Sequence, residues 1–338
     1  MAHRFLKRIQ AICIVLLACL AVPGPSPVKA QTSAGFAEKL QPFGQIYRQG
    51  QSLAQATFVA DNILVDANLS NAERRAEMQR RHEFLTPKIT DLRAAADRAS
   101  ADGPGLSLVE EDLLEAIRER TIAVLDATEA HIAQQAEFMN APVLERLTLL
   151  QNMQKNSIAR RQVVTAGELA FLQAFRATVK QTDLDYHQLS VRIAFSGADG
   201  LMIGQVDAIR RNTGTREADR EARDAFQANL HEARVAVDAA EGKVQQMRLV
   251  PRPELDQDLL GQIFGGQADW VALHREAIGV YRGYGELLWK PDGTRRQIDP
   301  GAFAEQDQKL VELGQRMDAN STLISDLSAR LLRGTQKN

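Results

Sequence analysis

The chain has 338 residues, a formal net charge of −2 and only 5% aromatic residues. Four of the 41 Lys and Arg residues and none of the 43 Asp and Glu residues lie in the first 30 positions, which leaves a net charge of −6 for the rest. An acidic chain without a basic block is a poor partner for nucleic acid. Both cysteines, Cys13 and Cys19, also lie in this leader, so the remainder offers no disulfide, thiolate metal site or attachment for c-type haem.

Residues 1–30 are predicted to be a signal peptide. Three basic residues precede an apolar run over 9–22, which is the right length for a secretory signal and short for a membrane span. Small residues before Gln31 predict cleavage near Ala30 and a periplasmic or secreted protein. A less favoured alternative is a lipoprotein, because the residues ending at Cys19 resemble a lipobox. No later segment is apolar enough to predict a transmembrane helix.

The first half of the remaining chain shows apolar residues at alternating steps of three and four, which is typical of helices packed along their length. Capping boxes at Ser70/Glu73 and Ser107/Glu110 predict two helix starts. The predicted helices span 36–67, 70–101, 107–139 and 142–154.

An unbroken spacing of this kind also runs through residues 166–195, around which the rest of the chain is organised. It predicts one helix that begins at Thr165, with Glu168 completing a capping box, and ends in the Gly-rich stretch 196–200. Its core-facing positions are Leu172, Phe175, Val179, Thr182, Tyr186, Leu189 and Ile193.

Three further long helices are predicted in the C-terminal part. A short helix or hairpin tip over 201–209 precedes them, and a short piece over 254–264 ends at Gly265-Gly266. Pro291-Asp292-Gly293 is predicted to form a turn. The three long helices span 215–248, 267–289 and 300–332.

No segment alternates apolar and polar residues with period two, so the predicted fold is all-α. Short connections between long helices predict antiparallel neighbours, in one or two up-and-down bundles with coiled-coil-like heptad spacing. The expected domains are N-terminal helical hairpins over 31–163 and a C-terminal bundle over 164–338, with one continuous domain as the alternative. Polar residues at core positions, such as Asn320, either fix helix pairing or indicate contact with a protein partner or a second copy.

The helix 267–289 is the strongest local signal for function. It holds both Trp residues of the chain and two of its four Tyr. Trp270, His274, Tyr281 and Tyr284 follow three-four steps and therefore share one face. Aromatic side chains with polar tips suit a groove that binds a small ligand. The alternative is that this face is simply core.

The sequence contains no complete short motif that indicates metal binding or catalysis. Glu-x-x-His, His-x-x-x-His and His-x-x-Glu spacings are all absent, so no metal, cofactor or catalytic residue is predicted. The segment around Met202 is close to the Gly-Leu-Met-Gln stretch of lytic transglycosylases, but two residues are inserted and no catalytic Glu precedes it. The apolar segment 193–206 is also short for a membrane-touching tip. His82, His131 and His274 lie near core positions, and their simplest interpretation is packing.

These observations predict an exported, non-enzymatic helical-bundle protein of the bacterial cell envelope. It would act by binding a protein partner or a small ligand. The alternative is a metal-binding protein or envelope enzyme whose site is assembled from residues far apart in the sequence.

Overall fold

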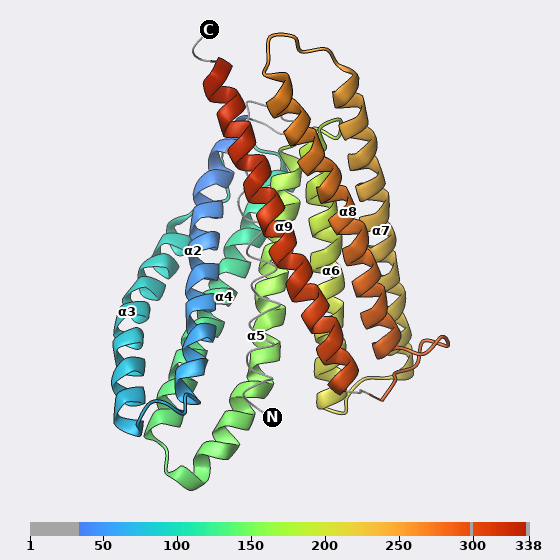
Figure 1. Cartoon of the computed structure of the whole chain (residues 1–338). Helices are drawn as coiled ribbons and strands as arrows, with labels where there is room; N and C mark the ends of the chain where they lie inside the picture. The colour runs from blue at the N-terminus through green and yellow to red at the C-terminus, as the bar shows by residue number, and fades with distance from the viewer. Residues whose placement is uncertain (1–33, 104, 298–299, 336–338) are drawn as a thin grey trace. The chain divides into compact units, whose positions relative to one another are not determined.

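The computed structural model describes residues 34–103, 105–297 and 300–335 (Figure 1). These residues form helices that pack against their neighbours in bundles, and no strand occurs among them. The predicted all-α class is therefore confirmed. The predictions for the leader lie outside the described residues. In the described part of the chain the helices are α2 (Ala34–Leu64), α3 (Asn71–Arg98), α4 (Leu108–Asn140), α5 (Val143–Ala177), α6 (Leu184–Arg210), α7 (Arg216–Leu249), α8 (Gln257–Leu288) and α9 (Pro300–Thr335).

The chain divides into two compact units, and the division falls within α6. The first, here called the α2–α5 unit, comprises the described residues of Ala30–Thr178 and Asp199–Thr213. The second, the α7–α9 unit, comprises the described residues of Val179–Ala198 and Gly214–Asn338. A boundary between residues 163 and 164, as expected from the sequence, lies in the interior of α5. None of the described helices has the length and hydropathy needed to cross a bilayer.

The core of the α2–α5 unit is built from large side chains on α2 that meet α4 and α5. Phe36, Phe43 and Tyr47 of α2 form one buried cluster with Leu114 and Ile117 of α4. Further along the helices, α3 and α4 contribute to two more clusters of buried side chains. Burial of such apolar surface is the main favourable term that holds these helices together.

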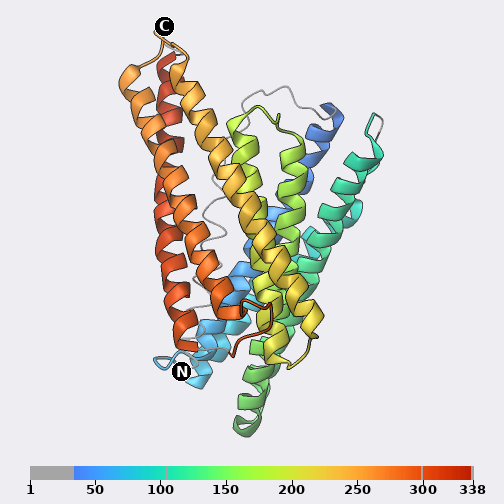
Figure 2. The same cartoon turned by 90° about the vertical axis from the view of Figure 1, so that its right-hand side faces the viewer.

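The core of the α7–α9 unit depends on small side chains. Ala233, Val237 and Ala240 on α7 pack against Val191 of α6 and Val271 of α8 in one buried cluster. A second cluster joins α8 to α9. Alanines at these positions allow α7 to approach α6 and α8 closely. Helices α7 and α8 lie side by side in both views (Figure 1 and Figure 2).

The helix predicted over 166–195 is wrong in its boundaries. Helix α5 ends at Ala177, a short connection follows, and α6 then runs from Leu184 to Arg210. The predicted turn at 196–200 is helical, and Gly197 shows why. A Cβ atom at Gly197 would lie 2.8 Å from Oδ1 of Asn229 on α7, so the small residue serves close packing instead of a turn.

Capping residues identified two helix starts correctly and one wrongly. Ser70 and Ser107 accept hydrogen bonds from the amides of Glu73 and Glu110, whose side chains bond back, so both capping boxes are confirmed. Thr165 instead lies inside α5 and is buried. The same residue spacing therefore occurs within a continuous helix, where its side chains face the core.

The start of the aromatic helix also differs from the prediction. Helix α8 begins at Gln257, with the side chain of Asp256 accepting from the amide of Leu259, and it continues through Gly265-Gly266. Gly266 lies against α9, where a Cβ atom would be 2.7 Å from Cγ1 of Ile324. The glycine therefore permits a close helix contact.

Candidate functional site

The aromatic face of α8 lies in the interior of the α7–α9 unit. Trp270, His274, Tyr281 and Tyr284 are all buried. The rings of Trp270 and His274 stack with centroids 3.9 Å apart, and Nδ1 of His274 donates to the carbonyl oxygen of Trp270 at 2.8 Å. Burial lowers the pKa of His274 to about 4, because the charged imidazolium would lose its hydration.

The two tyrosines on this face contact different helices. Tyr281 stacks on Phe195 of α6 with centroids 4.9 Å apart. The hydroxyl of Tyr284 donates a hydrogen bond to the carboxylate of Asp307 on α9. The structure therefore brings all four predicted site residues together along α8 and places them among protein side chains. Ligand binding by this face stays a prediction.

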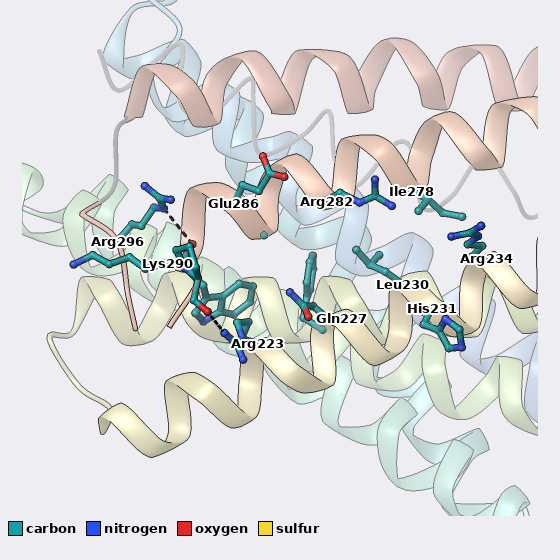
Figure 3. A pocket seen from close by; sticks show the side chains of 14 residues that line it. Arg223, Gln227, Leu230, His231, Arg234, Ile278, Arg282, Glu286, Lys290 and Arg296 are labelled. Atoms are coloured by element: carbon teal, nitrogen blue, oxygen red, sulfur yellow. Dashed lines mark hydrogen bonds between the residues drawn. The ribbon is translucent and has the colours of Figure 1, made fainter. Parts of the chain in front are cut away.

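A pocket lies on the neighbouring face of α8, between α7, α8 and the loop after α8 (Figure 3). Its volume is about 490 Å³, within the usual range of about 300–1,000 Å³ for small-molecule sites. We call it the α7–α8 pocket. It is lined by Arg223, Phe226, Gln227, Leu230, His231, Arg234, Ile278, Arg282, Gly285, Glu286, Trp289, Lys290, Pro291 and Arg296.

The apolar part of this pocket is formed by Phe226, Leu230, Ile278 and Trp289, which are all buried. Phe226 and Trp289 pack with ring centroids 5.3 Å apart. Gly285 makes this contact feasible, since a Cβ atom there would lie 2.9 Å from Cε1 of Phe226. Nε1 of Trp289 is buried and has no hydrogen-bond partner among the described residues.

The loop at the end of the pocket is held by several polar contacts. Arg223 donates to the carbonyl oxygen of Pro291 at 2.7 Å, and Arg296 donates to that of Trp289 at 3.1 Å (Figure 3). Arg295 forms an ion pair with Asp219 at 2.8 Å, and both side chains are largely buried. The predicted turn is confirmed by the positive φ of Gly293, 81°. These contacts fix the end wall of the pocket.

Positive charge dominates the rim of the α7–α8 pocket. Its lining includes the cationic side chains of Arg223, Arg234, Arg282, Lys290 and Arg296, against the single carboxylate of Glu286. In Figure 3 this carboxylate lies on the side of α8 that faces away from α7.

Not all of these cations are equally available to a ligand. Arg223 forms an ion pair with Asp224 at 2.7 Å, and Arg234 lies 4.0 Å from Asp238. Arg282 is exposed and makes no hydrogen bond or ion pair with any described residue. The rim therefore combines partly neutralised cations with Arg282, which has no anionic partner among the described residues.

A second polar group lies inside the α2–α5 unit. Nε2 of His131 is 2.7 Å from Oδ1 of Asp61, and the side-chain amide of Gln135 donates to the same oxygen at 2.6 Å. The ring of His82 lies 3.0 Å from the amide oxygen of Gln135. Burial raises the pKa of Asp61 to about 6, although the charge of Arg160 and the bond from Gln135 lower it. We call these four residues together with Arg160 the Asp61 network.

The Asp61 network joins residues that lie far apart in the sequence. Its members come from four different helices, which explains why no local spacing in the sequence revealed it. In the described part of the chain, no three His, Cys, Asp or Glu side chains are grouped so that they could hold a metal ion. The Arg160 guanidinium, 4.0 Å from Asp61, also disfavours a second cation beside that carboxylate.

The α7–α8 pocket was missed by sequence reasoning, although a weak signal was present. On α7, Arg223, Gln227, Leu230 and Arg234 recur at steps of three and four, and α8 carries a matching polar stripe that includes Arg282. Each stripe alone resembles a solvated helix face. Only the packing of α7 on α8 places the two stripes around one hollow.

Comparison with known proteins gives no functional assignment. No protein-family model, curated protein or solved structure matches this chain.

Proposed function

We propose that this protein is an exported, non-enzymatic binding protein of the bacterial cell envelope and that it holds a small ligand in the α7–α8 pocket. The observation that carries the proposal is a pocket of about 490 Å³ with an apolar floor and a polar rim. Binding sites for small molecules combine these features, because the floor supplies affinity and a few polar groups fix orientation. Export rests on the leader at residues 1–30.

A small ligand is favoured here over a protein partner that binds along the helices. The aromatic face of α8 is packed against α6 and α9, so it does not offer a free surface for a second chain. The α7–α8 pocket instead opens between exposed side chains such as Gln227, Arg282 and Lys290.

The test is retention of a small molecule by the mature protein. Protein from residue 31 onward is equilibrated with the low-molecular-weight fraction of a cell-envelope extract, washed and analysed by mass spectrometry. Gln227→Phe places a bulky ring in the pocket and should abolish retention. Gln245→Phe makes the same exchange at an exposed position of α7 that does not line the pocket, and should leave retention unchanged.

Capture of a protein, without retention of a small molecule, would favour the alternative that this protein binds a protein partner. If the wild type retains no small molecule, and a stoichiometric protein partner is captured equally well by wild type and by Gln227→Phe, the proposal fails. Equal retention by all three proteins would place the ligand elsewhere and would also refute the assignment to this pocket.

The second candidate function is a site assembled from distant residues, and the Asp61 network is the observation that favours it. A buried carboxylate with a raised pKa beside a histidine is typical of acid-base groups as well as of packed cores. Elemental analysis after native purification tests the metal version of this alternative. One equivalent of tightly held iron, zinc or copper, lost in His131→Gln, would support it over a ligand-binding role.

A further inference from the structure

The lining of the α7–α8 pocket specifies a chemical class of ligand. Its floor is apolar and aromatic, with Phe226, Leu230 and Ile278 buried beneath the rim. A ligand that fills this floor must carry an apolar portion, because contact with these side chains removes apolar surface from water on both partners.

The rim specifies the charge of the ligand. Five cationic side chains face one carboxylate around the pocket, and Arg282 has no anionic partner in the described part of the chain. The guanidinium group of arginine presents a planar set of donors that matches carboxylate and phosphate oxygens. Cations around a hollow with apolar walls attract an anion more strongly than cations on an open surface do.

The end wall of the pocket adds rigidity. Trp289 is 3% exposed, and its ring packs on that of Phe226 in the floor. The loop that carries Lys290 and Arg296 is already fixed by Arg223 and by the Arg295–Asp219 ion pair, which reduces the entropy lost on binding.

From these three features we infer that the ligand is a small soluble organic oxyanion, a carboxylate or phosphate with an apolar portion. The oxyanion lies against Arg282 at the rim, and the apolar portion lies on Phe226 and Leu230. This inference rests on the proposed function, because it names the ligand class of the same pocket.

The test uses two anionic probes and one neutral control. The anions 3-phenylpropionate and phenyl phosphate are compared with 3-phenylpropionamide, which has the apolar portion of 3-phenylpropionate without its charge. Binding is followed by calorimetry and by the ¹H–¹⁵N signals of the two indole groups. The Trp289→Phe variant assigns these signals, since the chain has two Trp residues.

We expect at least one anion to bind about tenfold more tightly than the amide, as a charge-assisted contact adds about that factor. The Trp289 indole signal should move on binding, and the Trp270 signal should not. Arg282→Gln should weaken binding of the anion about tenfold and leave the amide unaffected. Arg330→Gln removes the same charge from an exposed position on α9, outside the pocket lining, and should change neither affinity.

Several results would overturn the inference. Equal affinity for anion and amide, equal losses in Arg282→Gln and Arg330→Gln, or no binding of either anion at millimolar concentration would each do so. Arg282-dependent binding to phosphatidylglycerol vesicles without binding of the soluble anions would show that the site recognises a lipid surface instead. If a neutral molecule is retained from the envelope extract in a Gln227-dependent manner, this inference fails while the proposed function stands.

Discussion

Two buried ionisable side chains give the molecule opposite responses to pH. Asp61 in the α2–α5 unit has a raised pKa, and His274 in the α7–α9 unit has a lowered pKa. Desolvation is the largest cause in both cases, because burial disfavours whichever form is charged. The sign of each shift decides the pH range in which folding is weakened.

For Asp61, we predict that stability falls as pH rises from about 4 to about 6. Its pKa is about 6 in the folded protein and 3.8 in the reference state, so the folded state holds the proton more tightly. The full effect is about 2–3 kcal/mol. Chemical denaturation of wild type and Asp61→Asn, compared from pH 4 to pH 7, should show wild type losing stability relative to the variant. A difference that does not change with pH would contradict the raised pKa.

His274 leads to the reverse prediction. Its pKa falls from 6.5 to about 4 on folding, so the stability due to the neutral ring is present above pH 6.5 and is lost as pH falls toward 4. The expected loss is about 3 kcal/mol. His274→Gln keeps a hydrogen-bond donor for the Trp270 carbonyl but cannot titrate, so it should lack this acid sensitivity. An NMR titration of the His274 ring with a midpoint near its usual value would show that the residue is hydrated.

At the scale of helices, adjacent glycines in α8 have different roles. A Cβ atom at Gly265 would meet no atom within 4 Å, whereas one at Gly266 would lie 2.7 Å from Cγ1 of Ile324 on α9. Gly266 also offers its carbonyl oxygen to the side chain of Asn320 at 3.0 Å. This bond explains the polar residue at a core position of α9, because its amide has a defined partner.

This contrast predicts opposite effects of one substitution. Gly265→Ala should stabilise the protein by about 0.5–1 kcal/mol, because alanine restricts the unfolded chain and favours a helix interior. Gly266→Ala should destabilise it, because the branched Ile324 side chain must move away from its α8 contact. Thermal unfolding of the two variants measures both effects. A stabilising Gly266→Ala would show that α8 and α9 are not in close contact there.

For the molecule as a whole, the predicted leader is the feature on which its cellular location depends. We expect expression in a Gram-negative host to yield a mature protein that begins at Gln31, because small residues precede that position and the basic and apolar segments of a signal peptide come before them. Intact mass spectrometry of the exported protein decides this. A mass that includes a diacylglyceryl group on Cys19 would support the lipoprotein alternative, and retention of residues 1–30 would refute cleavage.

The local sequence was sufficient for the helical class and for several helix ends. The capping boxes at Ser70 and Ser107 and the turn at Gly293 were predicted correctly, because each depends on contacts between residues a few positions apart. The three-four spacing likewise placed Leu172, Leu189 and Ile193 at core positions, and all three are buried.

Only the tertiary structure decided where the helices are interrupted and which polar side chains meet. Apolar spacing continues across the connection between α5 and α6 because it reflects burial, and burial does not require a continuous backbone. Residues 196–200 and Gly265-Gly266 resemble turns in the sequence, yet they lie within helices, where Gly197 and Gly266 face close neighbours. The Asp61 network and the α7–α8 pocket each join residues distant in the chain. Their chemistry exists only after packing has removed water and placed side chains of different helices within contact distance.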